Sequence, residues 1–288
     1  MKILGYENME KPTTLCVPQL KGGYVDTKQV YSVHPTIVCV TQWKGGVAKT
    51  TTADCFAAAL VLFHGKRVLI VDNDPQANTT IALLPTETVV DKDVCSLYYK
   101  GELQDAVYPS VVPGLDIVPS SIDLSIVEMR IISEIGREQL LKDALDCDFA
   151  KKYDYIIIDT SPLLGSIVIN SLNAANKLLI PVSDYFSLEG ISKFLNVIFE
   201  IKKKINKDLE IGGVVLTLFN ERTVINKNIR DEVKNVFKDL VLETSIPENV
   251  KLKEAPSYKQ SIFTYAPSST GAGAYKKLTK EIVSKWEV

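Results

Sequence analysis

Residues 42–51 of the chain read Gln42-Trp43-Lys44-Gly45-Gly46-Val47-Ala48-Lys49-Thr50-Thr51. A short apolar run of β type, Ile37–Val40, precedes them, and a helical pattern follows through Phe63. This order of strand, glycine turn and helix is the context that a phosphate-binding loop requires. Paired glycines let the backbone approach phosphate oxygens, and the start of the helix offers unpaired N–H groups and a positive dipole end. The stretch therefore predicts a phosphate site that opens an α/β domain.

The two lysines of this stretch distinguish it from the ordinary Walker A sequence, G-x-x-x-x-G-K-[ST]. Trp43 and Ala48 stand where that pattern has glycine, whereas the deviant form K-G-G-x-x-K-[ST], with an additional lysine at Lys44, matches. In a phosphate loop Lys49 would neutralise the outer phosphates, and the Thr50 hydroxyl would be a ligand of Mg²⁺. The alternative is a Gly-Gly turn that merely carries lysines, and the motifs that follow in the sequence argue against it.

Carboxylates end two further apolar runs. The run Val68–Val71 is followed by Asp72-Asn73-Asp74-Pro75-Gln76, and Tyr155–Ile158 is followed by Asp159-Thr160-Ser161-Pro162. Carboxylates beside a phosphate loop suit coordination of Mg²⁺ and orientation of an attacking water, and the second run has the form of a Walker B strand. We expect residues 160–165 to act as a switch segment that senses the γ-phosphate. An ordinary solvated turn is the alternative for the first stretch, and Asp154 is expected to be a solvated or capping residue.

Apolar runs alternate with helical patterns along the rest of the chain. Further strands are expected at Arg67–Val71, Gly114–Val118, Lys177–Val182 and Gly213–Leu218, with a short one at Val241–Glu243; helices are expected at Leu188–Lys204, Val224–Lys238 and Ala272–Trp286. Continuous apolar strands separated by helices predict a twisted, mostly parallel sheet flanked by helices on both faces. We expect a P-loop ATPase domain over residues 36–288, preceded by an extension or arm at residues 1–35.

Composition narrows the class of protein further. The net charge is −2, so any contact with nucleic acid has to come from a local basic patch. The sequence has no apolar run of membrane-spanning length and no signal-peptide pattern at its start, and its five cysteines form no C-x-x-C pair. These features favour a cytoplasmic protein with reduced thiols, and they argue against a metal-cluster carrier.

Four stretches together resemble the ParA/Soj branch of the ParA–MinD ATPases, over about residues 36–284. They are the loop at residues 44–51, the aspartate stretch at residues 71–78, Asp159-Thr160-Ser161-Pro162, and the stretch from Ile246 to Ser257. The resemblance implies an ATP-dependent sandwich dimer that hydrolyses ATP slowly. It also implies non-specific DNA binding, nucleoid association in the ATP-bound form, segregation of plasmid or chromosomal DNA, and a cognate ParB-like activating protein.

The resemblance also implies roles for individual residues. Lys44 would cross the dimer interface to the phosphates of the partner subunit, and Lys49 would bind the phosphates of its own subunit. Asp74 would position the hydrolytic water, whereas Thr50, Asp72 and Asp159 would act through Mg²⁺. The nucleotide-binding set is then Lys44, Gly45, Gly46, Val47, Ala48, Lys49, Thr50, Thr51, Thr217 and Pro247, the last two near the adenine. Ala48 departs from the glycine usual in the family, which bears on the hydrolysis rate.

Basic residues near the C-terminal half are the candidates for DNA contacts. The resemblance places Arg222 and Lys251 at basic positions that relatives use for DNA, while Glu248 stands where relatives often carry arginine. Lys227, Arg230 and Lys234 are spaced by three and four, so they share a helix face. Lys253, Lys276, Lys277 and Lys280 are further candidates. The alternative is a solvated charged face with no partner.

Three other functions remain open from the sequence. A membrane-cycling positioner of the MinD type would need an amphipathic C-terminal helix, for which the tail at residues 278–288 is the candidate. A nucleotide-locked scaffold that barely turns over is suggested by Ala48. A metabolic or redox relative is disfavoured because the chain lacks a cysteine pair.

Overall fold

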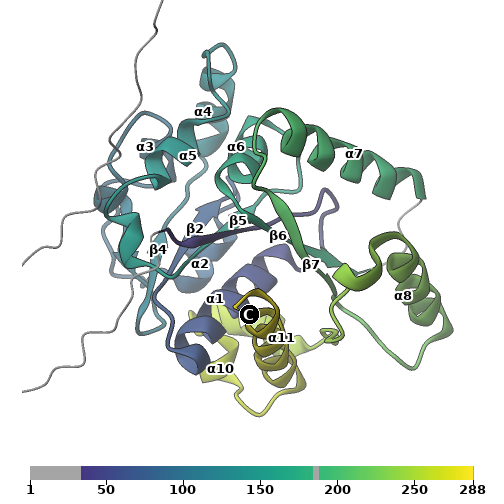
Figure 1. The fold of residues 1–288 in the computed structure, drawn as a ribbon. Helices are drawn as coiled ribbons and strands as arrows, with labels where there is room; N and C mark the ends of the chain where they lie inside the picture. Colours follow the sequence, from purple (N-terminus) through teal and green to yellow (C-terminus); the bar gives the residue numbers. More distant parts are fainter. Residues whose placement is uncertain (1–33, 184–187, 288) are drawn as a thin grey trace, which may run out of the picture. The chain divides into compact units, whose positions relative to one another are not determined.

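Strand β1 (Thr36–Val40), which leads into the phosphate loop, lies inside a seven-stranded sheet (Figure 1). The structure is a computed structural model that describes residues 34–183 and 188–287. These residues all belong to one compact unit. The predicted arm at residues 1–35 falls outside them except for its last two residues.

The sheet has the strand order β3-β4-β2-β5-β1-β6-β7. Neighbouring strands run parallel except for β3 and β4, which pair antiparallel. The remaining strands are β2 (Val68–Asn73), β3 (Tyr108–Pro109), β4 (Leu115–Val118), β5 (Tyr155–Thr160), β6 (Lys177–Val182) and β7 (Glu210–Leu216). This arrangement confirms the predicted twisted, mostly parallel sheet, whose ligands are expected at the carboxyl ends of the strands.

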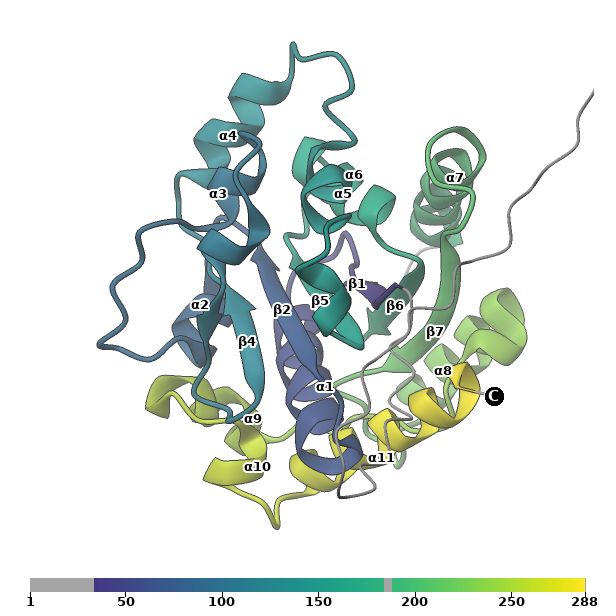
Figure 2. The same cartoon turned by 60° about the vertical axis from the view of Figure 1, so that its left-hand side comes forward.

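Helices cover both faces of the sheet, as Figures 1 and 2 show. The α-helices are α1 (Lys49–His64), α2 (Asn78–Leu83), α3 (Val94–Leu97), α4 (Leu124–Ile131), α5 (Leu140–Leu145), α6 (Ser166–Ala174), α7 (Leu188–Lys204), α8 (Val224–Phe237), α9 (Val250–Glu254), α10 (Ile262–Tyr265) and α11 (Thr270–Trp286). Short 3₁₀ turns lie at η1 (Leu103–Ala106), η2 (Ala150–Lys152), η3 (Lys238–Leu240) and η4 (Ala255–Tyr258). Within the described ranges, no helix combines the length and apolar character needed to cross a membrane.

The apolar strands divide their side chains between two layers because successive residues of a strand point to opposite faces. On β5, Tyr155 and Ile157 pack into the layer that contains α1 and α11, whereas Ile156 and Ile158 pack into the layer that contains α3 and α4. The strand is buried on both faces, which explains its unbroken apolar run.

One expected strand is wrong. Residues 241–243 form no strand; Val241 makes a single isolated bridge with Val214 of β7. The backbone N–H groups of Glu243 and Thr244 instead donate to the Glu281 carboxylate of α11, at 2.8 and 2.9 Å. The segment keeps single backbone bonds to β7, such as Leu242 N–H to the Val214 carbonyl at 2.8 Å, but the Glu281 side chain takes the next two N–H groups and no strand forms. Strand β3 is the one that sequence patterning missed.

The loop between β1 and α1 turns through two left-handed residues. Gly46 has φ 76°, and Ala48, which directly precedes α1, has φ 61° and ψ 36°. Glycine adopts this region freely, whereas the Cβ atom of alanine makes it costly. Ala48 therefore places local strain in the loop that the sequence assigns to phosphate.

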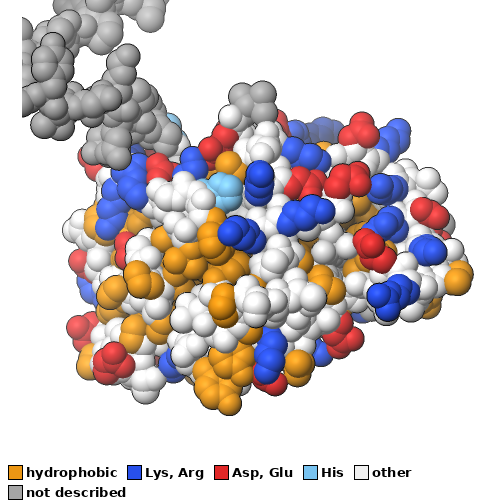
Figure 3. All heavy atoms as spheres, turned by 90° about the horizontal axis from the view of Figure 1, so that it is seen from below, with side chains coloured by type: hydrophobic (Ala, Val, Ile, Leu, Met, Phe, Trp, Pro, Cys, Tyr) orange, Lys and Arg blue, Asp and Glu red, His pale blue; other side chains and the backbone are white. Residues whose placement is uncertain are grey.

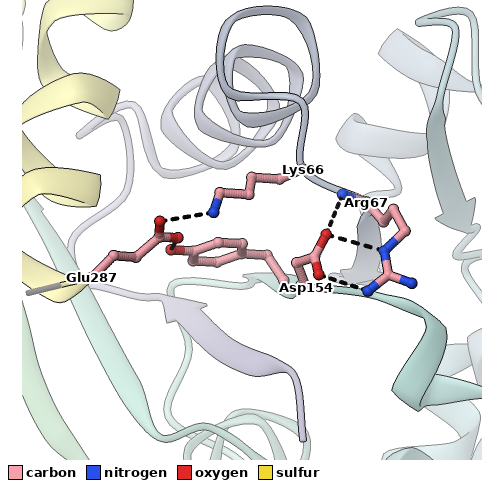
Figure 4. Close-up of polar contacts among 5 residues, drawn as sticks. Lys66, Arg67, Asp154 and Glu287 are labelled. Carbon is pink, nitrogen blue, oxygen red and sulfur yellow. Dashed lines mark hydrogen bonds and ion pairs between the residues drawn. The ribbon is translucent and has the colours of Figure 1, made fainter. Parts of the chain in front are cut away.

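Two neighbouring clusters of polar contacts lie at the amino ends of β2 and β5 (Figure 4). The Asp154 carboxylate accepts from the Arg67 backbone N–H at 2.8 Å and from its guanidinium at 2.7 and 3.1 Å. Beside it, Glu287 accepts from Lys66 Nζ at 2.7 Å and from the Tyr155 hydroxyl at 2.6 Å. The expectation that Asp154 is merely solvated or capping is wrong, because it anchors the start of β5 to the start of β2.

The pKa of Asp154 lies below its ordinary value. Partial burial alone would raise this pKa, but the hydrogen bonds and charge of Arg67 outweigh burial. Burial likewise raises the pKa of Glu287, but the hydrogen bonds from Lys66 and Tyr155 and the charge of Lys66 outweigh it and lower that pKa. A lowered folded-state pKa contributes stability above the unfolded value, and that stability is lost as the pH falls through the folded value.

We expect Ala48→Gly to raise the free energy of unfolding by about 1 kcal/mol, because relief of left-handed strain exceeds the added entropy of the unfolded chain. Urea denaturation measures the change. The matched control is Ala58→Gly, which lies in the middle of α1 and is fully buried; it should lose about 1 kcal/mol or more. A loss in both variants would contradict the strain at Ala48.

We expect Asp154→Asn to lower the free energy of unfolding by about 1 kcal/mol at pH 7, since the partly exposed pair is screened by solvent. The difference from the parent protein should shrink as the pH falls below about 4, where the unfolded-state carboxyl becomes protonated. Urea titrations at pH 7 and pH 3.5 measure both values. Asp148→Asn is the control, because its carboxylate pairs with Lys151 but is 97% exposed. Equal effects of the two variants would show that the Arg67 pair adds nothing.

Candidate nucleotide and magnesium site

The phosphate loop is held from inside while its tip stays open to solvent. Lys44, Gly45 and Gly46 are exposed, whereas Val47 is fully buried. Lys49 Nζ donates to the Lys44 carbonyl at 3.1 Å across the loop. The exposed glycines have no atoms near the positions that a Cβ would take. The tip therefore leaves space at the backbone for a bound group.

Thr217 supports this loop from the end of β7. Its side chain is fully buried, and its hydroxyl donates to the Val47 carbonyl at 3.0 Å. Pro247 lies beside the same strand end, because the N–H of the preceding Ile246 donates to the Leu216 carbonyl at 2.8 Å. The structure thus places Thr217 as an anchor of the phosphate loop, with Pro247 next to it.

Trp43 fixes the first part of the loop to α7. Its ring meets Phe194 edge to face, with 5.2 Å between ring centroids. Trp43 Nε1 is buried, with no hydrogen-bond partner among the described residues. Trp43 thus packs against the apolar cluster that contains Cys39 of β1 and Phe194 of α7.

Strand register brings two of the predicted carboxylates side by side. Asp72 on β2 is the register partner of Asp159 on β5, and Asp159 is also the partner of Val40 on β1. Adjacent strands lie roughly 4.8 Å apart. The end of β1 and both carboxylates therefore lie close together at the carboxyl end of the sheet. Both aspartates are fully buried.

The first turn of α2 orients these carboxylates. Thr80 donates to Asp72 Oδ2 from its backbone N–H and from its hydroxyl, each at 2.7 Å. The Thr79 hydroxyl lies 3.0 Å from Asp159 Oδ2 and 2.8 Å from Asp54 Oδ1 on α1. Asp54, Thr79 and Thr80 carry no motif of their own in the sequence and were not among the predicted site residues. Asp54 lies one helical turn after Thr50, a spacing that could have placed it near the site.

Asp74 lies beside the pair, with only 5% of its surface exposed. Its Oδ1 accepts from the Gln76 N–H at 2.9 Å, and its backbone carbonyl accepts from the Ser120 hydroxyl at 2.8 Å. Its charge also raises the pKa of Asp159. Asp74 is therefore near the other carboxylates, and its backbone is fixed.

Burial dominates the electrostatics of the site. It raises the pKa of Asp72 to about 8, aided by the nearby charge of Asp159. It also raises the pKa of Asp159 to about 7, against hydrogen bonds from Thr50 and Thr79. Burial lowers the pKa of Lys49, although Asp159 and Asp74 oppose that shift. Carboxylates crowded in this way hold their negative charge at a cost that a bound cation would reduce.

One atom tests whether Mg²⁺ fits here. Asp159 Oδ1 is buried and has no hydrogen-bond partner within the described part of the chain. Buried acceptors are rarely left unpaired, because desolvation without a partner is costly. Oxygen ligands from a carboxylate and from the Thr50 hydroxyl are those that Mg²⁺ prefers. The donor set therefore fits a magnesium ion at Asp159.

The predicted switch segment begins in the core and ends at the surface. Thr160 is buried and donates to the Val40 carbonyl at 2.9 Å, while Leu163 and Leu164 are 78% and 41% exposed. Gly165 lies against the Glu128 side chain of α4, since a Cβ there would lie 2.0 Å from Glu128 Oε1 unless that side chain moved. The segment thus connects the carboxylate strand β5 to α6 and passes beside α4.

Four of the nine candidate DNA contacts form ion pairs with acidic side chains. Arg230 pairs with Glu221 at 2.9 Å and stacks over Phe219, and Lys251 pairs with Glu254 at 2.9 Å. Two further pairs are Lys234–Glu243 at 3.6 Å and Lys253–Glu248 at 2.9 Å. Lys227 and Arg222 are exposed. Figure 3 shows blue and red side chains interspersed on the right-hand part of the face seen from below.

Two segments that carry these candidates are neighbours in space. The Phe219 N–H donates to the Ile246 carbonyl at 2.9 Å, which brings the turn after β7 next to the residues that lead into α9. Arg222 lies on the first of these segments and Lys251 on the second. The structure thus brings together the chain segments that lead to these two residues.

Known proteins are similar to this chain in sequence and in fold. A family model described as an AAA domain matches residues 35–211. The sporulation initiation inhibitor protein Soj of Bacillus subtilis is 41% identical over 83% of this chain and 94% of that protein. The chromosome partitioning protein ParA of Myxococcus xanthus is 37% identical over 83% of this chain and 84% of that protein. Cobyrinic acid a,c-diamide synthase of Mycobacterium smegmatis, solved with an ATP analogue and magnesium, has a TM-score of 0.75 at 29% identity and covers 88% of this chain and 96% of that chain.

These matches agree with the phosphate loop and the sheet order, and they confirm the resemblance inferred from the four sequence stretches. The chain belongs to the Soj/ParA family of partition ATPases.

Proposed function

We propose that the chain is an ATP-dependent switch that binds Mg·ATP at the described site, dimerises, binds DNA without sequence preference and hydrolyses ATP slowly. The observation that carries this proposal is the unpartnered Asp159 Oδ1, buried beside Asp72 and the phosphate loop. The solved relative from Mycobacterium smegmatis, which contains an ATP analogue and magnesium, supports the choice of ligand.

The proposed chemistry assigns one task to each side chain. Lys49 would neutralise phosphate charge, and Thr50 with Asp159 would hold Mg²⁺, which offsets the charge that develops during phosphoryl transfer. Asp72 would act on the magnesium shell from the neighbouring strand. Asp74, whose backbone is fixed by Ser120, would orient the attacking water.

The exposed lysine and the exposed apolar side chains around the site support dimerisation. Lys44 lies at the open loop tip, where a second subunit could meet it. Leu163 of the switch segment, together with Ile122 and Met129 at α4, is between 67% and 78% exposed. The end of the switch segment lies against α4, because the Ile167 N–H donates to Glu128 Oε1 at 3.3 Å, and exposed apolar groups on adjoining segments are typical of an interaction surface. We infer that this face meets a second copy when ATP is bound.

DNA binding would use Arg222, Lys227, Arg230 and Lys251. Release of counterions from DNA phosphates is the driving force that such lysines and arginines supply. The acidic partners at Glu221 and Glu254 reduce the local positive charge, so we expect the single chain to bind weakly and the dimer to bind more tightly through two surfaces. A ParB-like protein would then stimulate hydrolysis and release the DNA.

The membrane-cycling alternative is not favoured by the C-terminal segment. Trp286 Nε1 donates to the Gly212 carbonyl at 3.1 Å, and the indole packs on Phe56 with 6.0 Å between ring centroids. Leu278 and Ile282 are fully buried. The apolar face of α11 packs into the hydrophobic core, so it is not available to a lipid surface.

Light scattering with Mg·ATP, alongside nucleotide titration, tests the switch. Lys44→Ala should bind ATP but stay monomeric, because the interface loses its bridging charge. Asp74→Ala should form the dimer and hydrolyse ATP at least about tenfold more slowly, as expected for loss of a water-orienting group. Lys66→Ala, at the opposite end of the strands, is the control and should behave as the parent. Failure of the parent protein to bind Mg·ATP would refute the proposal.

Arg222→Ala should weaken DNA binding by the ATP-bound dimer and reduce the steepness of its salt dependence by roughly one unit per lost phosphate contact. Fluorescence anisotropy with duplexes of two unrelated sequences, measured across a salt series, gives both quantities. Lys151→Ala removes the same charge near the start of β5 and should leave the salt dependence unchanged. An Arg222→Ala variant that binds like the parent would exclude this surface.

A further inference from the structure

A single hydroxyl at the start of α2 lies between two carboxyl groups. Thr79 Oγ1 is 2.8 Å from Asp54 Oδ1 and 3.0 Å from Asp159 Oδ2, and Thr79 is fully buried. A threonine hydroxyl has one hydrogen to donate and lone pairs to accept with. It can therefore donate a hydrogen bond to one carboxyl group, and it satisfies the second by accepting a hydrogen bond from it.

The direction of this chain of hydrogen bonds follows from the surroundings of the two acids. Asp159 belongs to the magnesium site, where it has to be a carboxylate. Asp54 is half-buried beside a small cavity of about 30 Å³ between α1, α2, α9 and α10, which is lined by apolar Leu83, Leu252 and Ile262 and by polar Gln260 and Ser261. Burial raises the pKa of Asp54 well above its ordinary value, and the charge of Asp159 raises it further. Because Thr79 has a single hydrogen and Asp159 is the carboxylate, Asp54 is the group that carries a proton and donates the second hydrogen bond to Thr79.

We propose that Asp54 is a positioning residue for Asp159: its protonated carboxyl donates to the Thr79 hydroxyl, which donates to Asp159 Oδ2 and leaves Oδ1 for magnesium. The inference rests on the proposed Mg·ATP site and deepens it. Thr79 is held from both sides, so it fixes the plane of the Asp159 carboxylate before the cation arrives. Hydrogen bonds to a ligating carboxylate of this kind typically set metal affinity.

The arrangement makes Asp54 part of the site without contact to the nucleotide. Asp54 lies on α1 one turn after Thr50, and Thr50 is one of the groups that lower the pKa of Asp159. Helix α1 therefore acts on the same carboxylate from two positions, from Thr50 and from Asp54 through Thr79. Loss of the second route should loosen Asp159 while leaving the phosphate loop intact.

The test uses Mn²⁺ as a probe for the metal site in the full chain with a non-hydrolysable ATP analogue. Electron paramagnetic resonance gives the affinity for Mn²⁺, and fluorescent ATP with EDTA gives metal-free nucleotide binding. Asp54→Leu and Thr79→Val should weaken Mn²⁺ binding roughly tenfold. Asp54→Asn and Thr79→Ser keep the donors and should stay within about twofold of the parent. Metal-free nucleotide binding should not change in any variant.

The outcomes separate this inference from the proposed function. If the parent binds neither Mn²⁺ nor ATP, the proposed function fails. If the parent binds both and Asp54→Leu binds Mn²⁺ equally well, only the positioning role is overturned. Equal weakening by Asp54→Asn and Asp54→Leu would also overturn it, because the neutral donor would then not be what matters. Should Asp54→Leu fail to fold, the Thr79→Val and Thr79→Ser pair decides the question.

Discussion

The parallel pairing of β2 with β5 is the constraint on which the rest of the site depends. It places Asp72 directly beside Asp159, and the pairing of β5 with β1 brings the phosphate loop to the same carboxyl end of the sheet. A slip of one residue in either register would turn these side chains to the other face of the sheet. The unbroken apolar strands, buried on both faces, keep that register in place.

This geometry is electrostatically costly in the absence of a cation. Two buried carboxylates with raised pKa values lie in contact with α2, whose threonines supply much of their hydrogen bonding. Such an arrangement destabilises the folded chain at neutral pH and is typical of a functional site rather than of a structural one. A divalent ion would remove much of that cost, so the ligand stabilises the fold through the same groups that it uses for chemistry.

Much of this could be read from the sequence, because the information was local. The K-G-G-x-x-K-[ST] loop and the strand-end aspartates each identify themselves by their neighbours, and parallel strands bring their ends together. Long-range contacts could not be read in this way. Nothing local shows that Thr79 reaches Asp54, that Thr217 reaches Val47, or that Glu281 replaces a strand pairing at residues 243 and 244.

The contact of Trp43 with Phe194 has a consequence for spectroscopy. The chain has two tryptophans, and they lie at opposite ends of the strands. Trp43 adjoins the loop lysine at the carboxyl end of β1, whereas Trp286 is bonded to Gly212 near the amino end of β7. We therefore expect ligand-dependent changes in tryptophan emission to come from Trp43, and changes at Trp286 to report on unfolding.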